Sequence, residues 1–388
     1  MQLTFDSDVE EFRAEFAAFL DEHVPSEAET LERPKSVSHM PQWARDWQRL
    51  LFDNGWLLPA QPPEFGGRNA TVLQQFVHLD ELCRRRIYHS FNPQGVNIIA
   101  ASLLSFGSDE QKHRWAVPVL RGEKTASLGM SEPSAGSDLA SLRTRAELDG
   151  DHFVVNGQKV WTSGAHDADF LLTFVRTDPD APKHKGITIF FFPMNLPGIT
   201  VQPVDTLQDE RTNITFYDDV RVSDRYRLGE VNGGLKVMAA AMEIEHGGEG
   251  YHIYHHSLMK AAIEWASTAD PQGRRPIDRP AVRSRLARVR THLEIADLMC
   301  RRVTWAIGAD RMTRAIGPMA KMFATEIYME DAADLTALAA PATLRHETPA
   351  AAKIEESYRQ SIGQTIYGGT SEVHRGIIAQ HHLGLPRA

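Results

Sequence analysis

The chain has little cysteine and no long hydrophobic run, and each shortage excludes a class of protein. Its 388 residues include two cysteines, Cys83 and Cys300, and neither lies in a CxxC or other metal-binding spacing. A disulfide framework is therefore excluded, and we expect two buried thiols in a reducing compartment. No apolar run is long enough to span a bilayer. Residues 1–10 are acidic and contain no signal-peptide pattern, so the cytoplasm is the expected location.

The chain also lacks an excess of positive charge and the common nucleotide-binding motifs. The formal net charge is -9, which argues against binding to nucleic acid. The arginine clusters at residues 84–86 and 274–275 are expected on solvated faces, although one of them could instead contact cofactor phosphates. No Gly-x-Gly-x-x-Gly follows a strand and no P-loop occurs, so neither a Rossmann site nor a Walker site is supported.

What is present is a change of pattern from helix to strand and back. The length predicts two or three domains. Apolar residues recur at helical spacing after Asp6, a candidate N-cap, and strand-like segments begin near Glu123. Within these strands, Asn156-Gly157 predicts a hairpin turn between residues 152–155 and 159–162. Further strands are expected at residues 170–176, 186–193, 199–203 and 213–217, and the domains at 1–122, 123–232 and 233–388.

Two segments of the β region carry candidate ligand-binding groups. Residues 129–139 form a loop of small and hydroxyl residues, in which backbone N–H groups and serine hydroxyls can approach a polar ligand. The alternative for this loop is an ordinary surface turn. Residues 161–163, Trp-Thr-Ser, follow the expected hairpin, and the indole is either a platform for a flat ring or part of the core.

A carboxylate on an apolar helix face is the candidate general base. On a helix, Glu245 shares a face with Met238, Ala241 and Met242, whereas Glu243 lies on another side. Burial of a lone carboxylate raises its pKa, and a raised pKa suits a general base near neutral pH. The alternative is that Glu245 lies at the edge of the stripe and reaches water.

Two further clusters are weaker candidates. His252, His255 and His256 have a spacing that can hold a metal, but no carboxylate or cysteine partner stands at motif spacing, so we expect no metal site. Gly368-Gly369 predicts a turn that precedes a helix beginning near Ser371, and the N-terminus of such a helix can bind anions.

Three motifs, in this order, resemble the acyl-CoA dehydrogenase family. They are Glu-Pro-Ser-Ala-Gly-Ser-Asp-Leu at residues 132–139, Val-Asn-Gly-Gln-Lys-Val-Trp-Thr-Ser at 155–163, and Thr-Ile-Tyr-Gly-Gly-Thr-Ser-Glu at 365–372. Weaker matches at residues 63–68, 106–123 and 216–222 extend the resemblance over nearly the whole chain. The resemblance implies an N-terminal helical domain, a central β-barrel or sandwich domain, and a C-terminal four-helix bundle, with FAD between the last two.

The resemblance also assigns roles to particular residues. A base would remove the α-proton of an acyl-CoA thioester while a hydride passes from the β-carbon to flavin N5. By position, FAD would contact Met130, Ser131, Ser137, Trp161, Ser163, Thr370 and Glu372, and the substrate pocket would include Ser137, His246, Gly368 and Gly369.

The position of the base separates two groups within the family. Many members carry glutamate directly after the Ile-Tyr pair, where this chain has Gly368. A second group, which includes isovaleryl- and long-chain-type enzymes, places it on the first helix of the C-terminal bundle, and the matching residue is Glu245. The resemblance and the helical-face argument therefore select the same residue.

The chain departs from the family where a subunit reaches the FAD of its neighbour. Arg-x-x-Phe-Gly is expected where residues 272–275 read Gln-Gly-Arg-Arg, and a Gln with paired glycines is expected where residues 337–341 read Ala-Leu-Ala-Ala-Pro. His246 replaces the usual arginine, and the glycines that follow weaken that helix. The glycines after His246 would open the pocket to a bulky acyl group, whereas the two altered segments suggest a subunit that works beside a different family member, as in bacterial steroid catabolism.

Three functions remain open from the sequence. The leading one is α,β-dehydrogenation of an acyl-CoA, in a homo- or hetero-oligomer, with electron-transferring flavoprotein as the family's usual acceptor and with no membrane or nucleic-acid partner. The second is a non-catalytic partner subunit, which the altered half-site favours. The third is an oxidase or monooxygenase on the same scaffold.

Overall fold

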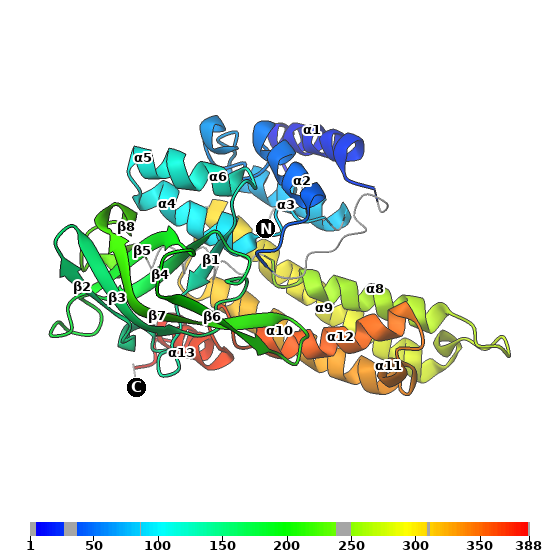
Figure 1. Ribbon diagram of the computed structural model, residues 1–388. Coiled ribbons are helices and arrows are strands. Elements are labelled where there is room, and N and C mark those ends of the chain that lie inside the picture. The colour runs from blue at the N-terminus through cyan, green and yellow to red at the C-terminus, as the bar shows by residue number, and fades with distance from the viewer. Residues whose placement is uncertain (1–4, 27–36, 86, 238–249, 309–310, 387–388) are drawn as a thin grey trace. The chain divides into compact units, whose positions relative to one another are not determined.

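A computed structural model describes residues 5–26, 37–85, 87–237, 250–308 and 311–386. The chain divides into two compact units, residues 2–245 and residues 246–388. The first unit contains a group of helices and a sheet, and the second is helical (Figure 1). The expected order of helical, β and helical regions is confirmed, while the exact domain boundaries remain predictions.

Aromatic packing organises the N-terminal helices. In the first helix, Phe12 and Phe16 are buried against Trp56, with ring centroids 5.1 and 4.7 Å away. Asp6 stands at the N-cap position of this helix, as predicted, but its side chain makes no capping hydrogen bond. The elements are α1 (Ser7–His23), α2 (Gln42–Asp53), η1 (Pro63–Phe65), α3 (Val72–Arg85), η2 (Gln94–Ala100), α4 (Ala101–Phe106), α5 (Asp109–Gln111), η3 (Lys112–Ala116) and α6 (Val117–Leu120).

The middle of the chain forms one eight-stranded sheet. The strand order is β6-β7-β3-β2-β4-β5-β8, and β1 pairs with β4 in parallel. The strands predicted at residues 170–176, 186–193 and 199–203 are confirmed with small changes at their ends, and the one at 213–217 is part of a longer strand, whereas residues 160–162 form no strand. Their bounds are β1 (Ala126–Gly129), β2 (Arg145–Asp149), β3 (His152–Lys159), β4 (Phe170–Arg176), β5 (Ile187–Pro193), β6 (Ile199–Asp205), β7 (Arg211–Ser223) and β8 (Arg227–Leu228), with the short helices η4 (Leu139–Ser141) and η5 (Asp224–Tyr226).

The central strands are apolar on both faces because both faces are covered. In β4, Leu172 and Phe174 belong to the core shared with the N-terminal helices. Leu171 and Val175 point to the opposite face and belong to a second core within the β region. This two-sided burial explains the continuous apolar run of β4, since a strand with one solvated face would alternate.

The predicted Asn-Gly hairpin is wrong. Residues 152–159 form the single strand β3, which continues through Asn156 and Gly157 with a bulge at Val155/Gly157 in its pairing to β7. The Asn156 side chain accepts from the Asp219 backbone N–H at 2.9 Å and donates to the Asp219 carboxylate at 2.9 Å. A Cβ on Gly157 would approach Thr144 to 2.7 Å, so this glycine permits a close approach of strands rather than a turn.

The C-terminal unit is the predicted four-helix bundle. Leu258, Leu286, Leu335 and Ile354 contribute buried side chains from its four main helices to a common core. The elements are α8 (Ile253–Ser267), η6 (Pro276–Asp278), α9 (Pro280–Gly308), α10 (Ile316–Leu338), α11 (Ala342–Arg345), α12 (Pro349–Gln364) and α13 (Ser371–His381). Among the described residues, no helix has the length and apolar character needed to cross a membrane.

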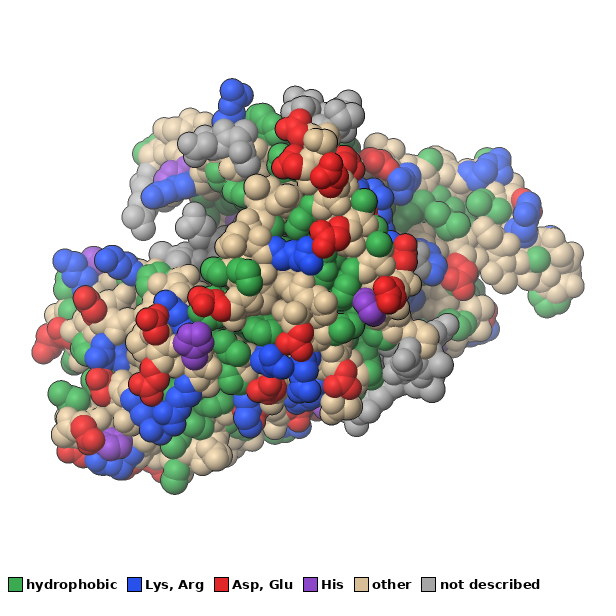
Figure 2. All heavy atoms as spheres, turned by 90° about the horizontal axis from the view of Figure 1, so that it is seen from above, with side chains coloured by type: hydrophobic (Ala, Val, Ile, Leu, Met, Phe, Trp, Pro, Cys, Tyr) green, Lys and Arg blue, Asp and Glu red, His purple; other side chains and the backbone are tan. Residues whose placement is uncertain are grey.

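Charged side chains are interspersed on the surface. Figure 2 shows acidic and basic groups mixed on one face of the molecule. The arginine clusters noted in the sequence take part in local ion pairs. Arg85 contacts Asp21 and Glu81 at 2.7 and 2.5 Å, and Arg274 contacts Asp270 at 2.9 Å. The side chain of Cys300 is buried, as predicted, while the side chain of Cys83 lies outside the described residues.

Candidate functional site

One buried carboxylate holds the loop of residues 129–139 in place. Glu132 accepts hydrogen bonds from the backbone N–H groups of Arg143 and Thr144 at 2.6 and 2.9 Å. It also accepts from Lys159 Nζ at 2.8 Å, and both side chains of this ion pair are buried. Burial alone would raise the pKa of Glu132, but Lys159 and the N–H donors outweigh it and hold that pKa below its usual value.

Lys159 ties two of the predicted site segments together. Its Nζ also donates to the Met130 carbonyl at 3.1 Å. Burial lowers the pKa of Lys159 to about 8, against the opposing effect of Glu132, so the ammonium is mainly charged at neutral pH. Beside it, the Val160 backbone N–H donates to the Ser131 carbonyl at 2.9 Å. The two segments are therefore joined by buried polar contacts at residues 130–132, while residues 133, 134 and 136–138 of the loop are exposed. Ligand binding by this loop remains a prediction.

The side chain of Trp161 is exposed on a turn whose backbone is fixed by hydrogen bonds. Its side chain is 61% exposed, so its interpretation as a core residue is wrong, and its backbone φ is +60°. The next residue, Thr162, donates from its N–H to the Asn213 carbonyl and accepts at its own carbonyl from the Asn213 side chain, both at 3.0 Å. Ser163 donates from its hydroxyl to Thr212 at 3.0 Å. These hydrogen bonds fix the backbone of the turn and leave the indole of Trp161 open to solvent.

The remaining predicted residues of the β region lie near this turn or at the loop surface. Met130 and Ser131 are half-buried at the segment that Lys159 and Val160 hold. Ser137 is exposed in the same loop, one residue before Asp138, whose carboxylate pairs with Lys183 at 2.8 Å. These positions leave the hydroxyl groups of the loop accessible.

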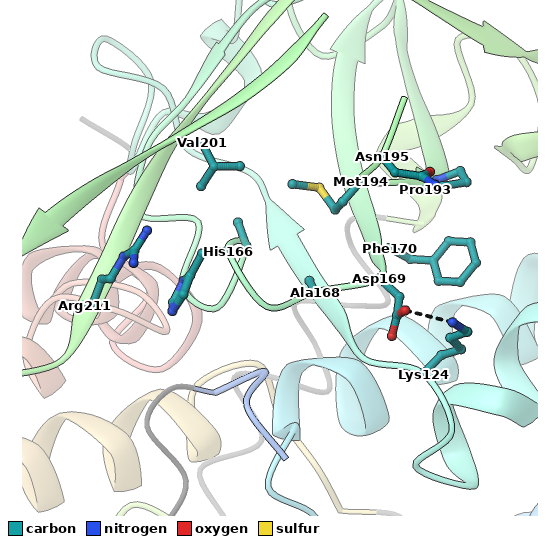
Figure 3. A pocket seen from close by; sticks show the side chains of 11 residues that line it. Lys124, His166, Ala168, Asp169, Phe170, Pro193, Met194, Asn195, Val201 and Arg211 are labelled. Atoms are coloured by element: carbon teal, nitrogen blue, oxygen red, sulfur yellow. Dashed lines mark hydrogen bonds and ion pairs between the residues drawn. The ribbon is translucent and has the colours of Figure 1, made fainter. Parts of the chain in front are cut away.

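A cavity of about 610 Å³ adjoins the same turn. In Figure 3, His166 and Arg211 lie on one side, and Lys124, paired with Asp169 at 2.9 Å, lies on the other. Asn213 joins the cavity to the turn, because its side-chain amide donates to His166 Nδ1 at 3.1 Å as well as to Thr162. Burial lowers the pKa of His166, and Arg211 adds to this effect, so the ring is neutral at pH 7. Sequence reasoning missed this cavity because its lining comes from five separated segments.

The Gly-Gly turn in the C-terminal unit is also held by buried polar groups. Gly368 and Gly369 have φ values of +63° and +87°. Lys321, fully buried on α10, donates to the Gly369 carbonyl at 2.7 Å, and His374 Nε2 contacts the Gly368 carbonyl at 2.9 Å. Burial lowers the pKa of His374, with Lys321 adding to the effect, so the neutral ring donates from Nε2. The lone lysine in an apolar stretch of α10 was the signal that sequence reasoning missed.

The helix after this turn begins as predicted. Thr370 is the N-cap of α13, and its hydroxyl accepts from the Val373 N–H at 3.2 Å. Glu372 is exposed in the first turn of the helix, and hydrogen bonds from its own backbone N–H and from Thr370 lower its pKa. The candidate base Glu245 and the candidate pocket residue His246 lie outside the described residues.

The histidine cluster has carboxylate partners that the sequence spacing concealed. His256 Nε2 lies 3.0 Å from Asp297 Oδ1, and His252 Nε2 lies 3.5 Å from the same oxygen. His255 turns to another partner, the buried Asp331, at 3.0 Å. The two carboxylates come from α9 and α10, far along the chain, so no motif spacing could reveal them.

The fold has a helical, a β and a second helical region, and the exposed Trp161 follows a strand of the sheet. Family models for the N-terminal, middle and C-terminal domains of acyl-CoA dehydrogenases match residues 6–123, 127–220 and 232–383. Acyl-CoA dehydrogenase FadE26 of Mycobacterium tuberculosis is 33% identical, with 100% of both chains covered. FadE29 of the same organism is 32% identical over 94% of this chain and 93% of the relative.

Solved structures agree with the sequence relatives. The Tcur3481-Tcur3483 steroid ACAD has a TM-score of 0.86 at 34% identity, with 100% of both chains covered. The ChsE4-ChsE5 complex from Mycobacterium tuberculosis has a TM-score of 0.84 at 32% identity, with the same coverage. The chain belongs to the acyl-CoA dehydrogenase family, whose members are FAD-dependent oxidoreductases. Within the β region, the open indole of Trp161 and its neighbouring hydroxyls are groups that can bind such a cofactor.

Proposed function

We propose that this enzyme removes the α-proton of an acyl-CoA thioester with Glu245 and forms the α,β-double bond. The observation that carries the proposal is the rigid platform of the β region. There, the buried Glu132–Lys159 pair joins the two predicted cofactor segments, and Trp161 remains 61% exposed beside them. A non-catalytic subunit would not require this arrangement, so the platform favours an enzyme with a flavin at this site.

Each predicted residue then has a physical task. Glu245 takes the α-proton, and the apolar residues at helical spacing from it in the sequence favour the raised pKa that a base needs near pH 7. FAD, when bound, supplies the electron acceptor for the hydride that leaves the β-carbon. Trp161 and the hydroxyls of Ser131 and Ser163 orient the cofactor, while Gly368 leaves space where other family members carry the base. The basic side of the cavity suits an anionic group, and both FAD and acyl-CoA carry phosphates.

The test compares two neighbouring glutamates under anaerobic conditions. The purified holoenzyme is mixed with a panel of acyl-CoA thioesters, and bleaching of the flavin band is recorded for the wild type, Glu245→Gln and Glu243→Gln. We expect bleaching with at least one thioester in the wild type and in the Glu243 variant, and none in the Glu245 variant. Bleaching in Glu245→Gln at the wild-type rate would refute the assignment of the base.

The same experiment in air separates the dehydrogenase from an oxidase. A dehydrogenase that passes electrons to a protein such as electron-transferring flavoprotein should reoxidise slowly with oxygen alone. Rapid reoxidation in air, with formation of hydrogen peroxide, would instead identify an oxidase.

We further propose that the enzyme acts on a steroid-derived acyl-CoA beside a different family subunit. Two similar solved structures carry two-protein names, and one of them is called a steroid ACAD. In this chain, Arg274 and Arg275 form ion pairs with Asp270 and Asp278 of their own loop. The family motif expected in this region would instead contact the FAD of a neighbouring subunit. Residues 337–341 are Ala-Leu-Ala-Ala-Pro, so they lack the glutamine that the family motif would place there.

This proposal is tested by the size and the flavin content of the purified chain. Alone, it should hold less than one FAD per chain, and co-expression with a second family subunit should raise the occupancy and give a mixed oligomer. A homotetramer with full FAD occupancy would overturn it. The substrate class is tested by including a steroid side-chain thioester beside isovaleryl-CoA in the bleaching panel.

A further inference from the structure

Three side chains of the C-terminal unit converge on one point between α8 and α9. His252 is the N-cap residue of α8, His256 lies one turn later, and Asp297 faces both from the middle of α9. The Nε2 atoms of the two histidines lie 3.5 and 3.0 Å from Asp297 Oδ1. One ligand atom from each of the three residues can be chosen so that all lie within 4.8 Å of one another.

These separations match those around a tetrahedral ion. Zinc binds imidazole nitrogen and carboxylate oxygen at about 2.0–2.2 Å, and tetrahedral angles then place the ligand atoms about 3.4 Å apart. The measured distances of 3.0 and 3.5 Å lie close to that separation. Histidines at i and i+4 on one helix are a recurrent spacing for zinc, because both rings point to the same side.

We propose that His252, His256 and Asp297 bind a divalent transition-metal ion, with zinc as the preferred ion. Two imidazoles and one carboxylate suit zinc, whereas calcium and magnesium require a shell of oxygen ligands. The side chain of His256 is 43% exposed and gives an ion access, while those of His252 and Asp297 are each 17% exposed and form the inner wall. Three protein ligands leave a fourth position for water.

A metal ion at this point requires a deprotonated carboxylate and neutral imidazoles, so its binding should weaken as pH falls. His255 lies on the same helix but contacts Asp331, so it stays out of the metal site.

A bound ion would fasten the start of α8 to α9. An ion that binds only the folded chain raises its stability in proportion to the logarithm of its concentration. This effect is independent of the reaction proposed above. The proposal is tested by metal content and metal affinity, and these can be measured whether or not the enzyme acts on an acyl-CoA.

The experiment uses the full-length holoenzyme freed of metal with a chelator. Zinc sulfate is added in competition with a chromogenic chelator, and the zinc retained is measured by mass spectrometry of the metal. The variants are His256→Gln and Asp297→Asn, with His346→Gln as the matched control. His346 is an exposed histidine of the same unit, and it pairs with one carboxylate, Glu355, at 3.1 Å.

We expect one tightly bound zinc per wild-type chain and per His346→Gln chain. Each ligand variant should bind zinc at least about tenfold more weakly than wild type. Loss of a group that only hydrogen-bonds to a metal ligand already costs about tenfold, and loss of a ligand itself should cost no less. The zinc absorption edge of the wild type should report two imidazoles and oxygen ligands. Failure of the wild type to compete with the chelator would overturn the proposal. Equal binding by wild type and both ligand variants, with unchanged circular dichroism and flavin absorbance, would overturn it as well.

Discussion

Replacement of Lys159 by methionine should destabilise the β region far more than the same replacement at an exposed ion pair. Lys159 and Glu132 are in contact at 2.8 Å with side-chain exposures of 0% and 5%. Lys183 and Asp138 are also in contact at 2.8 Å, but their side chains are 60% and 57% exposed. The two pairs therefore have the same chemistry and distance, and they differ in burial.

The expected magnitudes follow from that difference. Removal of one partner of a buried pair leaves an uncompensated charge and costs about 3–5 kcal/mol of unfolding free energy. Loss of an exposed pair typically costs between 0 and about 1 kcal/mol. The double variant Glu132→Gln/Lys159→Met leaves no buried charge unpaired. It should therefore be more stable than Lys159→Met alone, even though it loses the same ion pair.

The assay is equilibrium unfolding in urea at pH 7 with a fixed excess of FAD, since a bound cofactor adds to the apparent stability. Tryptophan fluorescence and circular dichroism are followed together, because coincident transitions justify a comparison of midpoints. Lys159→Met should unfold at clearly lower urea than wild type, and Lys183→Met should be nearly unchanged. Equal losses in the two variants would refute the argument from burial.

Three further predictions concern the sites themselves. Gly368→Ala should cost about 1–2 kcal/mol in thermal unfolding, because φ is +63° and the new Cβ would lie 2.3 Å from the Tyr251 hydroxyl. Trp161→Ala should leave urea unfolding without FAD nearly unchanged, since the side chain is 61% exposed, but should weaken FAD binding in a fluorescence titration. The folded-state pKa of Glu132 lies below its usual 4.5, so its contribution to stability is present above pH 4.5 and lost as pH falls through that lower pKa. Glu132→Gln should remove this part of the acid sensitivity in a pH series of unfolding curves.

The sequence predicted elements wherever a local pattern and the tertiary environment agreed. The strand at residues 170–176 coincides with β4, and the helix start near Ser371 coincides with α13, whose N-cap is Thr370. The hairpin at Asn156-Gly157 failed because two distant strands decide that region. Asn156 bonds to Asp219 on β7, and Gly157 makes room for Thr144 before β2. The turn preference of an Asn-Gly dipeptide carries no information about these distant residues, and their tertiary contacts override it.

Side-chain clusters built across helices were beyond sequence reasoning for a similar reason. The three histidines stand within five residues at the start of α8, so the sequence predicted their proximity, but their partners Asp297 and Asp331 lie on α9 and α10. Which carboxylate faces which histidine depends on how the helices of the bundle pack and rotate against one another. No spacing rule within one helix contains that information.

The buried ion pair gives a physical reason for the joint occurrence of two motifs in this chain. Glu132 belongs to Glu-Pro-Ser-Ala-Gly-Ser-Asp-Leu, and Lys159 belongs to Val-Asn-Gly-Gln-Lys-Val-Trp-Thr-Ser. Each charge would be costly to bury alone, so the carboxylate of the first motif requires the ammonium of the second. The same pair fixes the Met130 carbonyl, and the adjacent Val160 N–H fixes the Ser131 carbonyl. The two motifs therefore act as one structural unit, and a change in either should disturb the cofactor contacts predicted for both.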